Sequence, residues 1–170
     1  MVLLVKAGKD AGLKVAWETF YGGSPGTVTA IGEAGVDTLK QVTEWHKNAT
    51  LDLDPTVAAF SKRYPGKENE YTYYRAKAMW EMFAAAAKKA GSNDPVKVAK
   101  ALEGMKMPTP LGEIEMRADN HQLLQPLYVS TLSKNTKFDV EDSGLGWKSD
   151  AKIDGKATAL PTTCKMERPK

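Results

Sequence analysis

The stretch that decides the fold runs from residue 13 to residue 26 and reads LKVAWETFYGGSPG. Its first half places Trp17 in a partial alternation of apolar and polar side chains, which favours a β-strand. Its second half is a glycine-rich loop, in which Ser24 can cap, and Pro25 can begin, a short helix that ends at Ile31. The stretch therefore predicts a strand-loop-helix unit, the building block of α/β folds.

The flanking sequence extends this pattern in both directions. Helical spacing with proline or glycine at the boundaries predicts further helices: one that ends at Gly12, one over 55–64, one over 70–90 and one over 95–102. Apolar-polar alternation predicts strands over 36–45, 113–117 and 123–132, the last two as a hairpin. Helices and strands thus alternate along most of the chain.

Composition describes an ordinary globular protein. The 170 residues are 42% hydrophobic, 26% charged and 8% aromatic, and a chain of this length can bury a core without disulfides or metals. Twenty-four Lys and Arg against 21 Asp and Glu leave a net charge of +3, too small to predict a nucleic-acid partner. No apolar run approaches the roughly 20 residues of a membrane span, and the opening run breaks at Lys6, short of a signal-peptide core.

The side chains of catalysis are sparse and scattered. His46, His121 and Cys164 are the candidates for catalysis or metal binding, and none lies in a recognisable motif. We therefore expect no catalytic residue and no metal site. The loop over 22–26 lacks the Gly-Lys-Ser/Thr ending of a phosphate-binding loop, and we expect no cofactor. We expect each histidine to be solvated or singly hydrogen-bonded. The sequence thus favours a binding protein over an enzyme.

Several strings, in their order and spacing, resemble one family. They are Ala11-Gly12-Leu13-Lys14, the loop over 21–26, Ile31-Gly32-Glu33-Ala34-Gly35, the segment over 90–94, Thr109-Pro110-Leu111-Gly112-Glu113-Ile114, the segment over 119–122 and Pro126-Leu127-Tyr128. Over about residues 5 to 132 the chain resembles the carboxyl-terminal half of type I periplasmic solute-binding proteins of the branched-chain amino acid (Leu/Ile/Val) family, which serve ABC importers.

The resemblance implies a partial fold of that type. Members have two lobes, each with a sheet between layers of helices, joined by three crossovers. Residues 1–132 would be the carboxyl-terminal portion of the two lobes, and 133–170 a loop-rich tail that wraps them. The resemblance also implies an export signal outside this sequence, a periplasmic location, an ABC permease as partner and a small-molecule ligand. Because half of a fold leaves apolar faces open, we expect a homodimer.

The ligand site is expected at the loop after the first strand, because ligands of open α/β sheets lie beyond the carboxyl ends of the strands. Candidate contacts are Tyr21, Gly22, Gly23 and Ser24, and the start of the following helix favours an anion. In relatives that bind amino acids, the position matching Tyr21 is an acidic residue that pairs with the ligand's ammonium. A phenol in that place points to an aromatic or aliphatic carboxylic acid, unless Glu18 supplies the charge and the ligand is a branched-chain amino acid.

Tyr71 and Tyr73 are the second choice of contacts. They match the stretch where relatives bring an aromatic side chain to the crevice. An alternative function from another class is a small intracellular α/β ligand-sensing or interaction domain, which would need no export signal.

Overall fold

The computed structural model describes residues 1–20, 22–49, 55–65 and 70–169, with the backbone alone at 55–57 and 70–72. Contacts divide the chain into two compact units. Unit 1 comprises Met1–Tyr74 and Leu127–Lys152, and unit 2 comprises Arg75–Pro126 and the residues from Ile153 onward. The chain therefore passes between the units three times.

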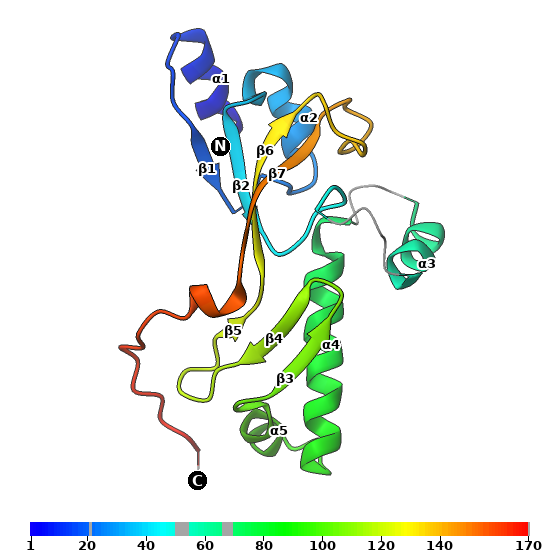
Figure 1. Cartoon of the computed structure of the whole chain (residues 1–170), viewed down its shortest axis with the longest axis vertical. Helices are drawn as coiled ribbons and strands as arrows, with labels where there is room; N and C mark the ends of the chain where they lie inside the picture. The colour runs from blue at the N-terminus through cyan, green and yellow to red at the C-terminus, as the bar shows by residue number, and fades with distance from the viewer. Residues whose placement is uncertain (21, 50–54, 66–69, 170) are drawn as a thin grey trace. The chain divides into compact units, whose positions relative to one another are not determined.

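Unit 1 is built on a four-stranded mixed sheet (Figure 1). Its strands are β1 (Trp17–Thr19), β2 (Leu39–Thr43), β6 (Leu127–Ser133) and β7 (Gly146–Ile153), in the order β1-β2-β6-β7. β1 runs parallel to β2, and β2 runs antiparallel to β6 with Gln41 opposite Ser130. The parallel pair comes from the strand-loop-helix unit, as expected. β6 enters the sheet from far along the chain.

The core of unit 1 lies between this sheet and the helical segments α1 (Val2–Asp10), α2 (Thr27–Ile31) and η1 (Gly32–Gly35). α3 (Pro55–Arg63) belongs to the same unit. The buried cluster consists of Val5, Val28, Ile31, Leu39, Leu132, Leu145 and Trp147. Gly12 follows the last turn of α1 with φ of 69°, a left-handed conformation that glycine adopts without strain, which confirms the expected end of this helix.

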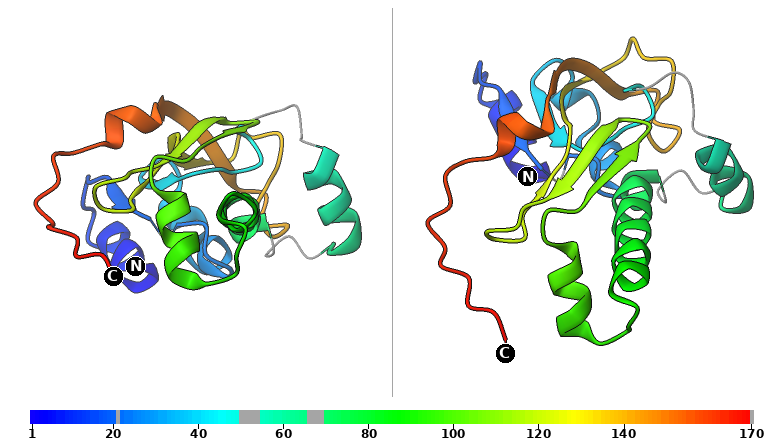
Figure 2. Two further views of the ribbon diagram at one scale, coloured as in Figure 1. Left: turned by 90° about the horizontal axis from the view of Figure 1, so that it is seen from below. Right: turned by 60° about the horizontal axis from the view of Figure 1, so that its bottom comes forward.

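Unit 2 packs two helices against a small antiparallel sheet (Figure 2). Its helices are α4 (Glu70–Ala90, in unit 2 from Arg75) and α5 (Pro95–Leu102), and its strands are β3 (Lys106–Thr109), β4 (Gly112–Met116) and β5 (Leu123–Leu124). Ala78 and Met82 of α4 bury against Ile114 of β4. The Asp94 carboxylate accepts a hydrogen bond from the Lys97 backbone N–H at 2.9 Å, so the expected cap of α5 is confirmed.

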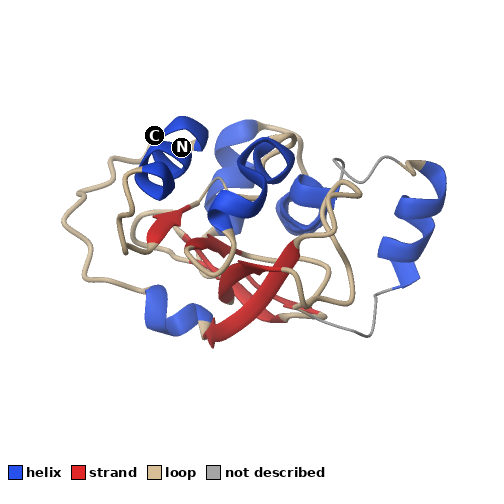
Figure 3. Cartoon of the chain, turned by 90° about the horizontal axis from the view of Figure 1, so that it is seen from above, coloured by secondary structure: helices blue, strands red, loops and turns tan. Residues whose placement is uncertain are grey.

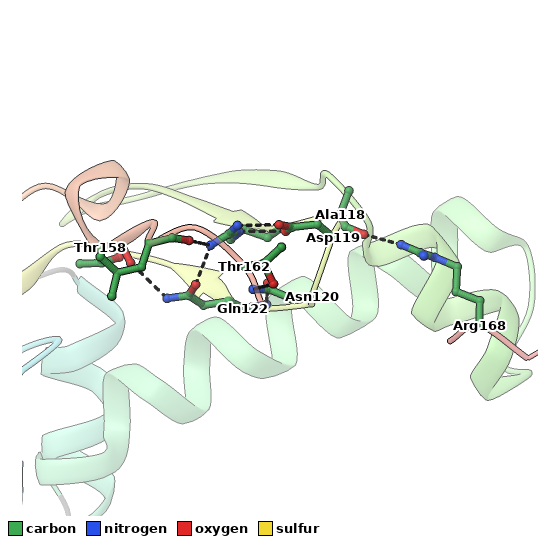
Figure 4. A network of polar contacts seen from close by, with 9 residues as sticks. Ala118, Asp119, Asn120, Gln122, Thr158, Thr162 and Arg168 are labelled. Atoms are coloured by element: carbon green, nitrogen blue, oxygen red, sulfur yellow. Dashed lines mark hydrogen bonds and ion pairs between the residues drawn. The ribbon is translucent and has the colours of Figure 1, made fainter. Parts of the chain in front are cut away.

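The carboxyl-terminal tail follows the 3₁₀ helix η3 (Gly155–Thr158) and is drawn as loop in Figure 3. Side chains of unit 2 hold it at both ends (Figure 4). Arg117 Nη1 donates to the Leu160 carbonyl at 2.7 Å, and Arg168 Nε donates to a Glu103 carboxylate oxygen at 2.6 Å. Cys164 is exposed between these two contacts. The tail therefore has specific partners although it has no regular structure.

The predicted hairpin is confirmed only next to its turn. β4 pairs antiparallel with the two residues of β5 across the turn over 118–121, and with β3 on its other side, whereas β6 leaves for the sheet of unit 1. The two-residue period of 123–132 predicted strand structure correctly but could not show that β6 pairs with β2. The segment after residue 133 is also less loop-rich than expected, since β7 forms an edge of the unit 1 sheet.

Candidate functional site

The loop after β1 lies close against the sheet of unit 1. Tyr21 lies outside the described residues, and its neighbour Gly22 is buried. A Cβ atom at Gly22 would stand 2.8 Å from Cη2 of Trp147 and 3.1 Å from Cβ of Gln41, closer than packed carbon atoms approach. The backbone of Gly22 therefore covers these two side chains, and only glycine fits here. Gly23 and Ser24 are half-buried beside it.

The start of α2 is already occupied by a carboxylate of the chain itself. Gly26, with φ of 76°, is the capping residue, and its N–H donates to Glu141 Oε1 at 2.7 Å. The Thr29 hydroxyl donates to Glu141 Oε2 at 2.8 Å. The expected cap by Ser24 and start at Pro25 are thus wrong, and the Gly26 N–H at this helix start is not free for an anionic ligand, because Glu141 accepts a hydrogen bond from it.

His46 lies just beyond β2 and is 93% buried, since only 7% of its surface is exposed. Its Nε2 atom is 2.8 Å from the Ser130 hydroxyl and 3.0 Å from the Ser149 hydroxyl. Burial lowers the pKa of His46 to about 4, so the imidazole is neutral at physiological pH. The expectation of a solvated or singly bonded histidine is wrong, because two strands of the sheet place a serine at the same ring nitrogen.

Gln41, His46, Ser130 and Trp147, with the exposed Ser149 at their edge, form what we call the buried polar cluster of unit 1. Gln41 and Trp147 are only 2% and 3% exposed. Within the described part of the chain, Gln41 Oε1, His46 Nδ1 and Trp147 Nε1 have no hydrogen-bond partner. These atoms combine an acceptor, a donor and a neutral imidazole. The cluster therefore has unused hydrogen-bonding capacity but offers no charge of its own.

The serine and histidine in this cluster do not form a catalytic pair. The Ser130 side chain is fully buried, and Ser149 competes for the same imidazole nitrogen. No carboxylate of the described residues orients His46 through Nδ1. A nucleophilic serine needs access to its substrate and a base that a third group orients. The arrangement of these two serines and His46 therefore fits ligand recognition or a structural role.

The other sequence candidates lie in different surroundings. The ring of Tyr73 packs on Phe60 with centroids 4.3 Å apart and on Tyr74 at 6.2 Å, so it belongs to an aromatic cluster. The side chain of Tyr71 lies outside the described residues. Glu18 is exposed and pairs in register with Lys40, on the face of the sheet opposite Gln41. Of the predicted set, the structure thus brings Gly22 to the buried polar cluster.

Sequence reasoning missed Gln41, Ser130, Trp147 and Ser149. A signal for Gln41 was present, since the two-residue period of β2 places it on the face of Leu39, and a polar residue on a buried face calls for an explanation. The other three depend on strands that meet only after the chain has left unit 1 and returned.

A pocket lies in unit 2, between α5 and the tail. It has a volume of about 300 Å³ and is lined in part by Val96, Ala99, Glu103, His121 and Arg168. Arg168 lowers the pKa of the Glu103 carboxyl, and His121 Nε2 stands 3.5 Å from the same carboxylate. Since Glu103 is already engaged by Arg168 and His121, this pocket is a weaker candidate than the loop of unit 1.

A family model described as periplasmic binding protein matches residues 1–137. The chain belongs to the periplasmic binding protein family. Leu/Ile/Val-binding protein homolog 4 of Brucella abortus (strain 2308) is 27% identical over 177 residues, which cover 99% of this chain and 42% of the relative. The chain thus spans less than half the length of the curated relatives it matches.

Solved structures agree with the family assignment. The leucine-, isoleucine-, valine-, threonine- and alanine-binding protein of Brucella ovis, in a closed conformation, matches with a TM-score of 0.83 and 25% identity, over 99% of this chain and 44% of its own. A leucine-binding protein of Thermotoga maritima shares the fold, with a TM-score of 0.65 at 19% identity over 90% of this chain and 41% of its own. The expected partial type I fold is confirmed. None of the described helices is both long and apolar enough for a membrane span.

Proposed function

We propose that this chain is part of the substrate-binding component of a bacterial ABC importer of the branched-chain amino acid family. It would act in the periplasm, capture a small organic acid or amino acid and deliver it to a membrane permease. The observation that carries the proposal is the family match over residues 1–137, together with a closely packed strand-to-helix loop over a buried polar cluster. Binding proteins of this type bury most of a ligand between two lobes.

The ligand class follows from charge. Amino-acid ligands carry an ammonium group, which is costly to bury unless a carboxylate pairs with it. Glu141 is bound to the start of α2, Glu18 lies on the opposite face of the sheet, and the buried Glu44 accepts a hydrogen bond from the Thr43 hydroxyl. The buried polar cluster itself is neutral, because burial keeps His46 uncharged. These features favour an aromatic or aliphatic carboxylic acid, whose uncharged part would lie towards this cluster, over a branched-chain amino acid.

Nuclear magnetic resonance titration of the isolated chain tests the proposal. With sodium benzoate at millimolar concentration we expect weak binding, with shifts at the amides of Gly22, Gly23 and Gln41, and no such shifts with leucine. The matched variant Gln41→Leu should lose the response while keeping the fold. Shifts with leucine instead of benzoate would reject the ligand class, and a loop that responds to neither ligand would reject the site.

The isolated chain should also respond weakly in a thermal-shift assay. A site that two lobes normally complete loses most of its contacts when part of the fold is missing, and the stabilisation by a ligand grows only with the logarithm of its concentration over Kd. A rise of several degrees with 1 mM benzoate, on the order of what a ligand at 100 times its Kd provides, would contradict this expectation.

A further inference from the structure

The chain passes between unit 1 and unit 2 at three places, which we call the crossings. It leaves unit 1 after Tyr74, returns at Leu127 and leaves again after Lys152. The first crossing lies within helix α4, the second at the start of strand β6 and the third near the end of strand β7. Connections between compact units absorb the backbone changes when such units move. The residues that hold these three segments in unit 1 therefore determine how independently each crossing can move.

Trp45, just beyond strand β2, holds the first crossing. Its ring packs against the ring of Tyr74, the last residue before that crossing, with centroids 5.5 Å apart. Both rings are buried. An aromatic pair excluded from water has a large contact area and a preferred geometry. Trp45 therefore ties the turn of α4 at Tyr74 to the end of β2.

His46, the next residue, holds the other two crossings. Its ring meets the ring of Tyr128, beside the second crossing, edge to face with centroids 6.0 Å apart. Its Nε2 atom lies 2.8 Å from the hydroxyl oxygen of Ser130 on β6 and 3.0 Å from that of Ser149 on β7. One imidazole thus joins the strand by which the chain returns to unit 1 and the strand by which it leaves again.

Hydrogen bonds on both sides keep Trp45 and His46 in place. The Thr43 hydroxyl, at the end of β2, donates to the Trp45 carbonyl oxygen at 3.2 Å. The His46 carbonyl oxygen accepts from the Ala49 N–H at 2.9 Å, which closes a turn directly after the pair. Because closely packed residues transmit displacements to their neighbours, a shift at one crossing reaches the others through this short backbone segment. We call Trp45 and His46 the crossing anchor.

We propose that the crossing anchor couples the three crossings, so that they loosen together rather than one at a time. The role of Trp45 and His46 in this coupling is one of positioning. The proposal goes beyond the proposed function and holds with or without a ligand, since every contact that carries it lies within unit 1. Because His46 also belongs to the buried polar cluster, a ligand bound there would reach all three crossings through one pair of residues.

Hydrogen exchange of the complete chain, read at single amides without a ligand, tests the proposal. His46→Leu keeps a buried side chain but leaves the Ser130 and Ser149 hydroxyls without the imidazole. We expect the protection of the amides over 128–131 and 149–152 to fall about tenfold, because hydrogen bonds next to them are lost. Protection over 74–78 should fall as well, although no residue there contacts His46 in the described contacts.

Two further variants separate coupling from a general loss of stability. His46→Gln, whose amide can still hydrogen-bond a serine hydroxyl, should restore most of the protection at all three crossings. Val28→Ala, a buried change in α2 of the same unit, is the matched control. It should lower protection across unit 1 without a larger effect at the crossings.

A double-mutant cycle tests the coupling itself. Tyr74→Leu removes the ring on which Trp45 packs at the first crossing. In the wild-type background it should lower the protection of the Ser130 and Ser149 amides by about fivefold, because the disturbance passes through the crossing anchor. In the His46→Leu background the same change should alter these amides by less than about twofold, since the link is already broken.

Three results would each overturn the proposal. They are a loss of protection in His46→Leu that stops short of 74–78, a uniform loss over unit 1 like that of Val28→Ala, and equal effects of Tyr74→Leu in the two backgrounds. Circular dichroism melts check that every variant is folded. If His46→Leu does not fold, Trp45→Leu provides the same test from the other side. It should lower protection over 128–131 and 149–152 as well as over 74–78, and a loss confined to 74–78 would reject the coupling.

Discussion

At Gly22 the protein leaves no room for a side chain. The missing Cβ is what allows the loop after β1 to lie on Trp147 and Gln41, and so to cover the buried polar cluster. The charge of His46 also depends on its immediate surroundings. Nothing in the neighbouring sequence indicates a shifted pKa, whereas burial in the fold lowers the pKa and keeps the imidazole neutral. Single positions therefore determine whether this site is closed and uncharged.

Gly22→Ala should destabilise unit 1 by about 1–3 kcal/mol, because the added methyl overlaps the Trp147 ring. Ser24→Ala, in the same loop, removes an atom rather than adding one and serves as the matched control, with a change within about 0.5 kcal/mol. Urea denaturation followed by circular dichroism measures both. An alanine tolerated at Gly22 would mean that the loop does not lie against the sheet as described.

His46 predicts a pH dependence of stability. Its pKa is about 4 in the folded state against 6.5 for an unperturbed histidine, so the unfolded chain takes up a proton first as the pH falls. The contribution of neutral His46 is complete above pH 6.5 and is lost as the pH falls from 6.5 to 4, by about 3 kcal/mol in total.

Urea denaturation between pH 4 and pH 8 measures this slope. In the variant His46→Gln, which keeps a polar side chain but does not titrate, the stability should vary less over the same range. Equal slopes in the two proteins would show that other groups cause the acid sensitivity.

Among the elements, α2 is bound at its start by a residue far away in sequence. It has five residues and no side-chain cap of its own, and the Glu141 carboxylate accepts from the N–H of the capping residue Gly26 and from the Thr29 hydroxyl. α5 is the opposite case, because Asp94 immediately precedes it and caps it. Local capping could be predicted for α5 from the Asp-Pro pair, and distant capping of α2 could not.

Glu141→Ala should weaken α2 by about 1 kcal/mol, since the Gly26 N–H and the Thr29 hydroxyl lose their acceptor. Hydrogen exchange at the amides of residues 27–30 measures the effect locally. Glu141→Gln keeps one oxygen acceptor and should have a smaller effect. Unchanged exchange in both variants would show that α2 is stable without this carboxylate.

At the scale of the whole molecule, the chain has two cores. The cluster around Leu39 and Leu132 holds unit 1, and the cluster around Met82 and Ile114 holds unit 2. Each unit is assembled from two separate stretches of sequence. A change in one core should therefore act first on its own unit.

Ile114→Ala should cost about 2–5 kcal/mol in unit 2, and Leu39→Ala a similar amount in unit 1, because each empties a fully packed position. Hydrogen exchange read separately over β4 and β2 locates the loss. If either variant destabilises both strands equally, the units unfold together and the two cores are not independent.

The sequence alone was sufficient for the local features. Proline, aspartate and glycine at the boundaries predicted α4 and α5, the two-residue period predicted β4 and β6 as strands, and the family strings identified the fold, because all of these depend on neighbours along the chain. Only the tertiary structure decided that β6 pairs with β2, that Glu141 completes α2 and that Ser130, Ser149 and Trp147 surround the candidate site. These contacts join residues from 84 to 125 positions apart, where many pairings satisfy the same local pattern and only the packing of the complete core selects one.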